Sequence, residues 1–331
     1  MEKQYDFVAI GDITIDAFIR IKDARVTCDI NDENCTICVR FGDKIPFEFD
    51  EIVAGVGNSP NAAAAAAKLG LNAAVSAAIG NDSRGEDCMN AMKNAGVSTD
   101  FIETHKDLGT NYHYVLWYEN DRTIFVQHHE YPRTLPAFEN PPKWIYLSSL
   151  AKNTENFHHQ IAEYVRTHPE TKLAFQPGTF QISLGTASIK DIYKVAEILF
   201  CNKEEAERIL NTQSGDIQEL LRGLHALGPR TVVITECPKG ATTFDGTNTW
   251  FMPMYPDPKP PYERTGAGDA FASTVTAALA LGKPLEEALS WGPVNSMSVV
   301  QYVGAQKGQL SREKLEEYLT NAPPEYALRK I

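Results

Sequence analysis

The sequence lacks any long, uninterrupted apolar run. Its most apolar window, residues 60–80, consists mainly of alanine but also contains Lys68, Gly70 and Asn72. We expect a buried helix followed by a strand there, because a membrane-spanning helix needs about 20 predominantly apolar residues. Residues 1–6 are polar and acidic, which predicts that the protein has no export signal and is cytoplasmic.

Positive charge is also scarce. The chain has 31 Lys and Arg against 43 Asp and Glu, a formal net charge of -12. Such a surface argues against nonspecific binding to nucleic acid or to an anionic membrane. With 43% hydrophobic and 22% charged residues, the composition is that of an ordinary globular protein. The length of 331 residues suffices for one large α/β domain. We find no internal repeat or long linker, so residues 1–331 are predicted to form a single domain.

Cysteine is infrequent, with six in the chain, and in a cytoplasmic protein these are expected to be reduced thiols. Cys28, Cys35 and Cys38 lie close together, and Cys35-x-x-Cys38 has the spacing of half a zinc site. A closed structural zinc site requires four ligands, and no histidine or further cysteine lies nearby in the sequence. We therefore interpret the three as small apolar side chains, with zinc as the alternative.

The dinucleotide-binding fingerprint is missing its third glycine. Gly55 and Gly57 satisfy the first part of Gly-x-Gly-x-x-Gly, but Pro60 stands where the last glycine belongs. This excludes a Rossmann fingerprint. The segment instead predicts a glycine turn that leads into a helix, since proline is tolerated in the first helical turn.

Short apolar runs that alternate with helical segments predict an α/β fold with a central, mostly parallel, doubly wound sheet. The predicted strands include residues 7–10, 72–79, 144–149, 173–176, 198–202 and 231–235. In such sheets ligands gather at the carboxyl ends of the strands. Asp12 and Asp16 follow the first strand and are therefore candidates for contact with a substrate.

Two segments show the alternation of antiparallel strands. Residues 25–51 contain β-type runs separated by turn residues and predict a small β flap that covers a substrate site. Residues 110–128 predict a hairpin. The aromatic side chains of this hairpin could stack on a base or belong to the core: Tyr112, Tyr114, Trp117 and Tyr118. Its polar residues could reach a substrate or simply lie on the surface: Asn111, His113 and His128.

The most informative stretch is Gly266-Ala267-Gly268-Asp269, which opens an alanine-rich helical segment. At a helix start the backbone N–H groups lack intrahelical partners and the helix dipole favours an anion such as phosphate. Asp269 would repel a phosphate unless its role is to remove a proton from an attacking hydroxyl. The alternative is a helix cap with two turn glycines.

Asn202 and Glu205 follow the strand at residues 198–202. An amide and a carboxylate at a strand end could hold a hard cation, because a cation that keeps most of its water needs few protein ligands. They would equally form an N-capped helix with an acidic first turn.

Gly-Ala-Gly-Asp with an upstream Asn-x-x-Glu resembles the PfkB, or ribokinase-like, carbohydrate kinases, with elements in the family's order from Gly11 to about Gly308. The resemblance implies a three-layer sandwich and ATP-dependent phosphorylation of the hydroxymethyl group of a sugar. Asp269 would be the base, and the N–H groups of Gly266, Ala267 and Gly268 would stabilise the transferring phosphoryl group. The alternatives are an adenosine-type nucleoside kinase and a catalytically silent sugar- or nucleotide-binding protein.

The resemblance also implies which residues bind each substrate. The expected acceptor residues are Asp12, Asp16, Gly57, Asn58 and Asn61, with Asp82 and Arg84 as further candidates, and the expected Mg-ATP residues are Asn202, Glu205, Thr235, Gly240 and Asn295. Glu205 would meet Mg²⁺ through water. Glu263 and Arg264 depart from the family motif, and Glu263 bears on a monovalent cation site, so potassium activation is left open. Relatives often form homodimers through the flap.

Overall fold

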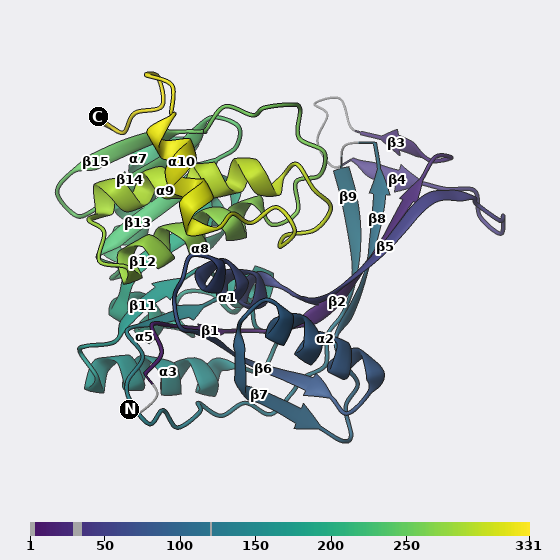
Figure 1. The fold of residues 1–331 in the computed structure, drawn as a ribbon, viewed down its shortest axis with the longest axis horizontal. Helices are drawn as coiled ribbons and strands as arrows, with labels where there is room; N and C mark the ends of the chain where they lie inside the picture. Colours follow the sequence, from purple (N-terminus) through teal and green to yellow (C-terminus); the bar gives the residue numbers. More distant parts are fainter. Residues whose placement is uncertain (1–3, 29–34, 120) are drawn as a thin grey trace.

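The computed structural model describes residues 4–28, 35–119 and 121–331, and these fold around a ten-stranded sheet (Figure 1). Six parallel strands continue from β7 (Ser98–His105) through the centre of the sheet: β6 (Ala73–Gly80), β1 (Phe7–Ile10), β10 (Trp144–Leu147), β11 (Lys172–Phe175), β12 (Ala196–Asn202) and β13 (Thr231–Glu236). The antiparallel strands β14 (Gly240–Phe244), β15 (Thr249–Pro253) and β16 (Arg329–Lys330) complete one edge.

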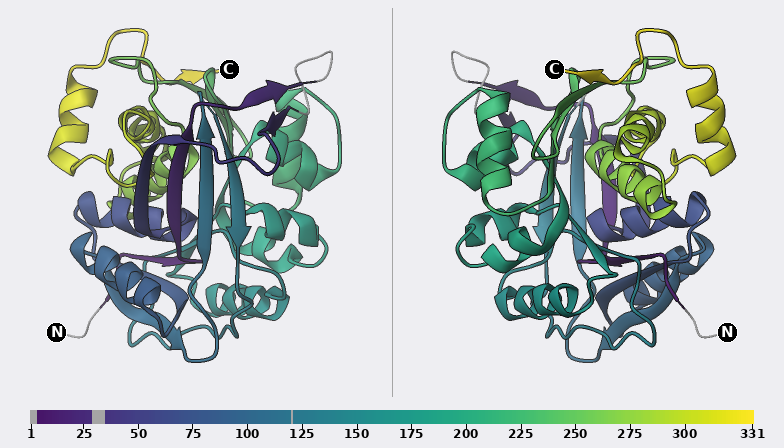
Figure 2. Two further views of the ribbon diagram at one scale, coloured as in Figure 1. Left: turned by 90° about the vertical axis from the view of Figure 1, so that its right-hand side faces the viewer. Right: turned by 90° about the vertical axis from the view of Figure 1, so that its left-hand side faces the viewer.

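Helices cover both faces of this sheet, as the two side views show (Figure 2). One layer contains α1 (Asn58–Lys68), α2 (Ser83–Asn94), α8 (Ala267–Ala280), α9 (Leu285–Val299) and α10 (Arg312–Thr320). The other contains α3 (Glu155–Thr167), α5 (Lys190–Val195), α6 (Lys203–Leu210) and α7 (Ile217–Ala226), and α4 (Thr179–Leu184) follows β11. The predicted three-layer α/β sandwich is confirmed. None of the described helices is both long and apolar enough to cross a membrane.

The sequence explains why the sheet is covered on both sides. Every residue of β1 and β6 is buried, as expected for parallel strands with helices on each face. The alanines of α1 and α8 are small, so these helices pack closely against each other and against the sheet. The starts of both helices thus come together at the carboxyl ends of the strands.

A second sheet of four strands projects from the body (Figure 1) and is called the lid below. Its order is β5 (Phe47–Val56), β2 (Thr14–Ile21), β8 (Tyr112–Tyr118) and β9 (Asp121–Gln127). The predicted hairpin in residues 110–128 is confirmed as β8 and β9, and the predicted flap in residues 25–51 contributes the start of β5. β2, which the sequence analysis did not identify as a separate strand, is a central lid strand, because the chain leaves the body sheet at Gly11 and Asp12.

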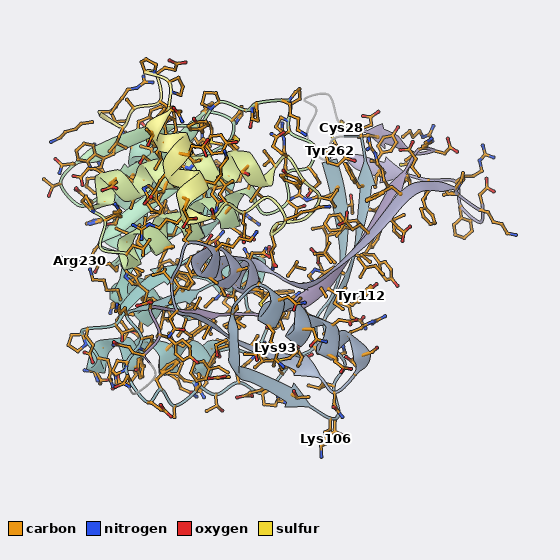
Figure 3. All side chains as sticks on the ribbon, in the orientation of Figure 1. Cys28, Lys93, Lys106, Tyr112, Arg230 and Tyr262 are labelled. Carbon is orange, nitrogen blue, oxygen red and sulfur yellow. A yellow bond between two sulfur atoms is a disulfide. The ribbon has the colours of Figure 1, made fainter. Side chains whose placement is uncertain are left out.

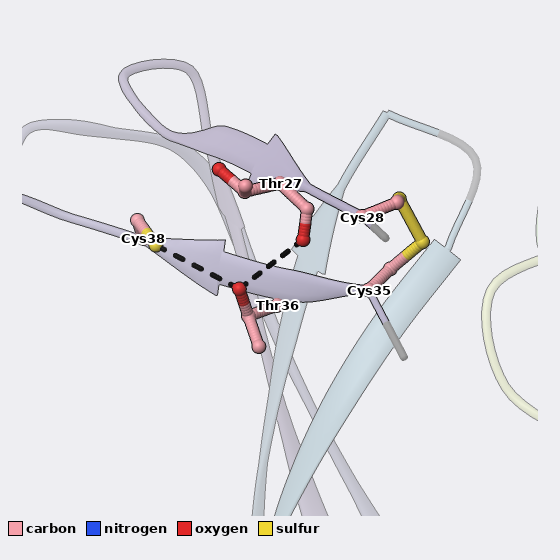
Figure 4. Close-up of a disulfide and its surroundings, with 5 residues drawn as sticks. All are labelled: Thr27, Cys28, Cys35, Thr36 and Cys38. Carbon is pink, nitrogen blue, oxygen red and sulfur yellow. Dashed lines mark hydrogen bonds between the residues drawn. A yellow bond between two sulfur atoms is a disulfide. The ribbon is translucent and has the colours of Figure 1, made fainter. Parts of the chain in front are cut away.

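The first part of the predicted flap forms a separate ribbon of β3 (Arg25–Thr27) and β4 (Thr36–Cys38). Across its end, Cys28 and Cys35 form a disulfide with Cα atoms 4.0 Å apart (Figure 4). The expectation of six reduced thiols is therefore wrong for this pair. A zinc site of Cys28, Cys35 and Cys38 is also contradicted, because two of the three sulfurs bond to each other.

This disulfide gives a simple prediction. Unfolded protein that has not been treated with reductant should show four thiols, from Cys38, Cys88, Cys201 and Cys237, and two more after reduction. Thiol titration with metal analysis of the same sample measures both quantities. Six thiols before reduction, or zinc at one atom per chain, would contradict the pairing.

Candidate active site

A cavity of about 200 Å³ opens at the start of α8. It is lined by residues from distant parts of the chain, including the predicted Asn58, Asn202, Glu205, Thr235, Gly266, Ala267, Gly268 and Asp269. Arg264 also lines it, as do two residues that the sequence did not indicate, Arg122 and Gln176. The predicted anion-binding helix start and the predicted Asn-x-x-Glu element therefore share one cavity.

The cavity depends on the turn at Gly266, the N-cap of α8. Gly266 has φ 78°, in the left-handed region, and a Cβ there would lie 2.2 Å from the Cβ of Ala305. Only glycine meets both conditions. The turn brings the first N–H groups of α8, which have no intrahelical acceptors, to the lining of the cavity.

Asp269, in the first turn of α8, accepts hydrogen bonds from three side-chain amides. Asn58 Nδ2 donates to Oδ1 at 2.9 Å, Asn61 Nδ2 to Oδ2 at 3.0 Å and Gln176 Nε2 to Oδ1 at 3.2 Å. Burial raises the pKa of Asp269 above its usual range, and these bonds act in the opposite direction. The result is an oriented carboxylate with a strengthened affinity for a proton, as a general base requires.

Asn202 and Glu205 form the helix cap that was one of the two roles left open by the sequence. Asn202 Oδ1 accepts from Glu205 N at 2.8 Å, and Glu205 Oε2 accepts from Asn202 N at 2.9 Å, so the pair caps α6. Both residues also line the cavity. Burial raises the pKa of Glu205, and the nearby Asp269 carboxylate acts in the same direction. Two carboxylates that face one cavity repel each other, so the cavity favours a positively charged group.

The two carboxylates after β1 belong to a continuous polar chain. Asp16 Oδ1 is 3.1 Å from His113 Nδ1, His113 Nε2 is 2.9 Å from His128 Nε2, and His128 Nδ1 is 3.2 Å from Asp12 Oδ2. Arg133 Nη2 donates to the other oxygen of Asp12. Asp12 is thus held by protein groups on both oxygens, whereas Asp16, at the base of the lid, is the better placed to meet an acceptor.

Comparison with known proteins decides the family. The model for the pfkB family carbohydrate kinases matches residues 33–312, most of the chain. This chain belongs to the pfkB family. It is therefore a phosphotransferase with an alcohol group as its acceptor.

Individual relatives agree with this assignment. The ribokinase of Bacillus subtilis is 29% identical over 274 residues, which cover 80% of this chain and 87% of that protein. The Arabidopsis thaliana ribokinase solved with ribose and ATP superposes with a TM-score of 0.78 at 19% identity, covering 96% of this chain and 99% of that one. A nucleoside kinase from Methanocaldococcus jannaschii gives 0.77 at 17% identity, covering 96% and 100%. These structures establish the fold.

Several residues suggested by the pfkB resemblance lie in supporting positions. Asn295 is fully buried, donates to Thr274 Oγ1 at 2.7 Å and accepts from Leu310 N at 2.9 Å, which joins α8 to α9 away from the cavity lining. Gly240 opens β14 with φ 136°. Gly57 approaches Asp12, since a Cβ there would lie 2.7 Å from the Asp12 carbonyl oxygen.

Other candidates at the lid base are structural as well. Asp82 caps α2 through Gly85 N and accepts from Thr110 N. Asn111 is fully buried, donates to Ile13 O and accepts from His129 N. These bonds secure the junction between the lid and the body, and the buried Asn111 side chain has little surface left for a substrate.

The aromatic side chains of the predicted hairpin do not form a stacking site in the cavity. Trp117 is 2% exposed and packs in the lid core with Phe18, Val115 and Val303. Tyr112, at the base of the lid in Figure 3, lies under the Arg84 guanidinium, 4.0 Å from the ring centre. Tyr114 is half-exposed and alternates with His113, so it faces away from the Asp16 side of the lid.

The lid contacts the loop before α8. Arg122 Nε, on β9, is 3.7 Å from Glu263 Oε1, and the Glu263 side chain is 3% exposed. The same Glu263 oxygen accepts from Thr265 N at 2.7 Å. Glu263, the departure from the family motif, therefore bonds to this loop and to the lid.

Within residues 4–28, 35–119 and 121–331, no group of three or more His, Cys, Asp or Glu side chains is arranged to hold a metal ion.

Proposed function

We propose that the chain transfers the γ-phosphoryl group of ATP to the hydroxymethyl group of a sugar. The observation that carries this proposal is Asp269, a carboxylate oriented by three amides at the start of a helix that favours anions. A carboxylate at an anion site is unfavourable unless it takes a proton during the reaction.

Because ATP is available in the cytoplasm, we also propose a cytoplasmic location. A reducing cytoplasm disfavours disulfides, so alkylation at lysis reports the state of Cys28 and Cys35 in the cell.

In this mechanism Asp269 accepts the proton of the acceptor hydroxyl as that oxygen attacks the phosphorus. The N–H groups of Gly266, Ala267 and Gly268 stabilise the negative charge that grows on the transferring group. Arg122 and Arg264, which line the same cavity, supply the positive charge that this acidic protein otherwise lacks. Most of the rate acceleration comes from positioning and electrostatics, and a closed lid excludes water as a competing acceptor.

The residues present fit a magnesium ion. The cap of α6 uses Glu205 Oε2, which leaves Oε1 to hold a water molecule of the cation, with Asn202 beside it. Mg²⁺ keeps several waters and takes phosphate oxygens as further ligands, so a protein cage is unnecessary. When bound, it would neutralise charge on the phosphates. Thr235 lines the same cavity and would contact the nucleotide.

A monovalent cation near Glu263 is a further proposal. A comparison of activity in potassium and in tetramethylammonium salts would test it.

The acceptor is proposed to be a sugar, bound at Asp16, Asn58 and Asn61. The polar chain from Asp16 through His113 and His128 suits a molecule rich in hydroxyl groups. The second candidate is a nucleoside, favoured by the fold shared with the Methanocaldococcus jannaschii nucleoside kinase. The aromatic residues that could have stacked on a base lie elsewhere, which favours the sugar.

A panel of free sugars and nucleosides in an ADP-release assay tests this proposal. We expect turnover with one or more sugars, and product analysis should show phosphate on a hydroxymethyl oxygen. Turnover restricted to nucleosides would select the second candidate. ATP binding without turnover on the whole panel would indicate a sugar- or nucleotide-binding protein without catalytic activity.

We also propose that the protein forms a homodimer through the lid. Ile52, Ala17, Tyr114 and Phe125 are cross-strand neighbours in one row over all four lid strands. Cross-strand neighbours share a face, and Ile52, Tyr114 and Phe125 are 63%, 50% and 58% exposed. A second copy of the lid would cover this apolar row, which lies on the face opposite Asp16.

Replacing Phe125 with aspartate should shift the protein from dimer to monomer, because a charge in this apolar row costs more to bury than the phenyl ring. Sedimentation velocity over a concentration series measures the shift. Phe41→Asp is the matched control, since Phe41 is fully exposed outside the lid sheet. A wild-type monomer at all concentrations, or a dimer that survives Phe125→Asp, would exclude this interface.

A further inference from the structure

Two of the three amides that hold Asp269 are themselves held by a second donor. The Tyr146 hydroxyl donates to Gln176 Oε1, the end of that amide that faces away from Asp269. Gln306 Nε2 donates to Asn61 Oδ1 at 3.0 Å, again the end opposite Asp269. Tyr146 is completely buried on β10, and Gln306 lies in the segment after α9. Neither residue lines the cavity, and the proposed mechanism does not use either.

Neighbouring groups that can only accept hydrogen bonds determine which end of each amide carries the NH₂ group and which carries the oxygen. The Gly55 carbonyl oxygen accepts from Gln306 Nε2 at 2.7 Å, so the NH₂ end of Gln306 must face both Gly55 and Asn61. Asn61 then presents its oxygen to Gln306 and its NH₂ group to Asp269. On the other side the Asp269 carboxylate accepts from Gln176, so Gln176 turns its oxygen to the Tyr146 hydroxyl.

This arrangement matters because an amide can rotate end for end. With the outer donor removed, a reversed Asn61 or Gln176 would place a carbonyl oxygen against the Asp269 carboxylate. The two oxygens repel, so the carboxylate would lose a donor and turn out of line with the acceptor hydroxyl. A small misplacement of a catalytic group can cost a large factor in rate.

The segment that carries Gln306 is anchored to the same site by its neighbours. Lys68 Nζ donates to the carbonyl oxygens of Gln306 at 3.2 Å and Gln309 at 3.1 Å. Gln309 Nε2 donates to the Asn61 carbonyl oxygen at 2.9 Å. Ala305 fills the space that a side chain on Gly266 would need. The position of Gln306 is therefore fixed relative to both α1 and the start of α8.

We propose that Tyr146 and Gln306 are positioning residues that hold the Gln176 and Asn61 amides in place and thereby fix the orientation of Asp269. The inference rests on the proposed function of Asp269 as the base. Tyr146 and Gln306 act on the reaction only through these two amides.

Other charged groups near Asp269 stay the same when these two residues change. Asp16 raises the pKa of Asp269, the Glu205 carboxylate lies close enough to interact with it, and Arg122 and Arg264 line the shared cavity. Because the amide bonds lower the pKa of Asp269, the loss of one raises it. The base is then deprotonated only at higher pH, so the acid limb of the kcat profile moves to higher pH.

The test uses Tyr146→Phe and Gln306→Met in the full-length protein, with kcat and KM measured against pH. We expect each variant to lower kcat about tenfold, to move its acid limb to higher pH and to leave the KM for ATP nearly unchanged. Tyr193→Phe is the matched control for the first, since Tyr193 is 1% exposed in the other apolar cluster. Gln218→Met, a partly buried glutamine on α7, is the control for the second.

A second readout needs no turnover. In protein labelled with ¹³C at the aspartate carboxyl carbons, the Asp269 signal, assigned with Asp269→Asn, should titrate at higher pH in both variants than in the wild type. If the wild type transfers no phosphoryl group, the proposed function fails while this titration still decides the inference. If the wild type is active but neither the acid limb nor the titration moves, the inference is overturned and the function stands. If Tyr146→Phe does not fold, the test can still be made with Gln306→Met, because Gln306 is partly exposed.

Discussion

Replacing Asp269 with asparagine should lower kcat by a factor of about 10²–10⁴, the usual contribution of a positioned general base. The asparagine keeps the size of the side chain but cannot take the proton of the acceptor hydroxyl. The nucleotide contacts proposed at Asn202, Glu205 and Thr235 would be unchanged, so ATP affinity should be largely retained. Steady-state kinetics with the best acceptor of the panel, and calorimetry with ATP, measure the two effects separately.

The matched control is Asp87→Asn, the same change at an exposed position on α2, which should leave both quantities as in the wild type. The remaining activity of Asp269→Asn should show no acid limb from this residue, because there is no carboxyl group left to protonate. Turnover of Asp269→Asn within a few fold of the wild type would exclude Asp269 as the base.

Gly266→Ala is expected to have the second-largest effect, a fall in kcat of about 10²-fold or more. The added Cβ would meet Ala305 at 2.2 Å, and the residue would keep a φ of 78°. To relieve the overlap the helix start must move, and the N–H groups proposed to stabilise the transferring phosphoryl group move with it. Stability should fall as well, by about 1–3 kcal/mol for the strained backbone.

Gly282 provides a control on the same helix. It follows the end of α8 with φ 83°, and no atom lies within 4 Å of the position that its Cβ would take. Gly282→Ala therefore carries the backbone strain without the overlap, so it should lose stability but little activity. Equal losses of kcat in the two variants would show that strain alone, and not the geometry of the helix start, explains the effect.

The start of α8 could be predicted from the sequence because its signals are local. Gly266, Gly268 and Asp269 lie within four consecutive residues, and a helix-forming run follows directly. The helix cap formed by Asn202 and Glu205 could be predicted as well, since the residues of a capping box are three apart in the sequence. In both cases the chemistry depends on neighbours in the chain, which a single sequence records.

The partners of Asp269 could not be predicted in the same way. Asn58 and Gln176 are 211 and 93 residues distant in the chain, and nothing near either one marks it as a donor to a carboxylate. Gln176 does end a strand at the edge where ligands gather, so its position was a usable but unspecific signal. Gln306 follows the last long helix and shows no local pattern at all.

The lid strand β2 was missed for a related reason, although the predicted segments contained β8, β9 and the start of β5. The alternation in residues 25–51 indicated β structure correctly, but strand partners are chosen by distant segments. β2 pairs with both β5 and β8, and only the complete sheet shows that it has left the body. The disulfide was missed because the expectation of a reducing compartment outweighed the seven-residue separation of Cys28 and Cys35.

The arrangement around Asp269 also has a consequence for synthesis of the chain. Asn61, Gln176, Asp269 and Gln306 are translated in that order, so Gln306 is added well after the carboxylate of Asp269. Domains fold progressively as the ribosome delivers them, so the central strands can pair long before the base is aligned. A product of premature termination between residues 281 and 305 would contain the whole of α8 and its carboxylate but not the amide that orients Asn61. Such fragments would consume little ATP, and phosphoryl transfer would begin only in molecules that contain Gln306.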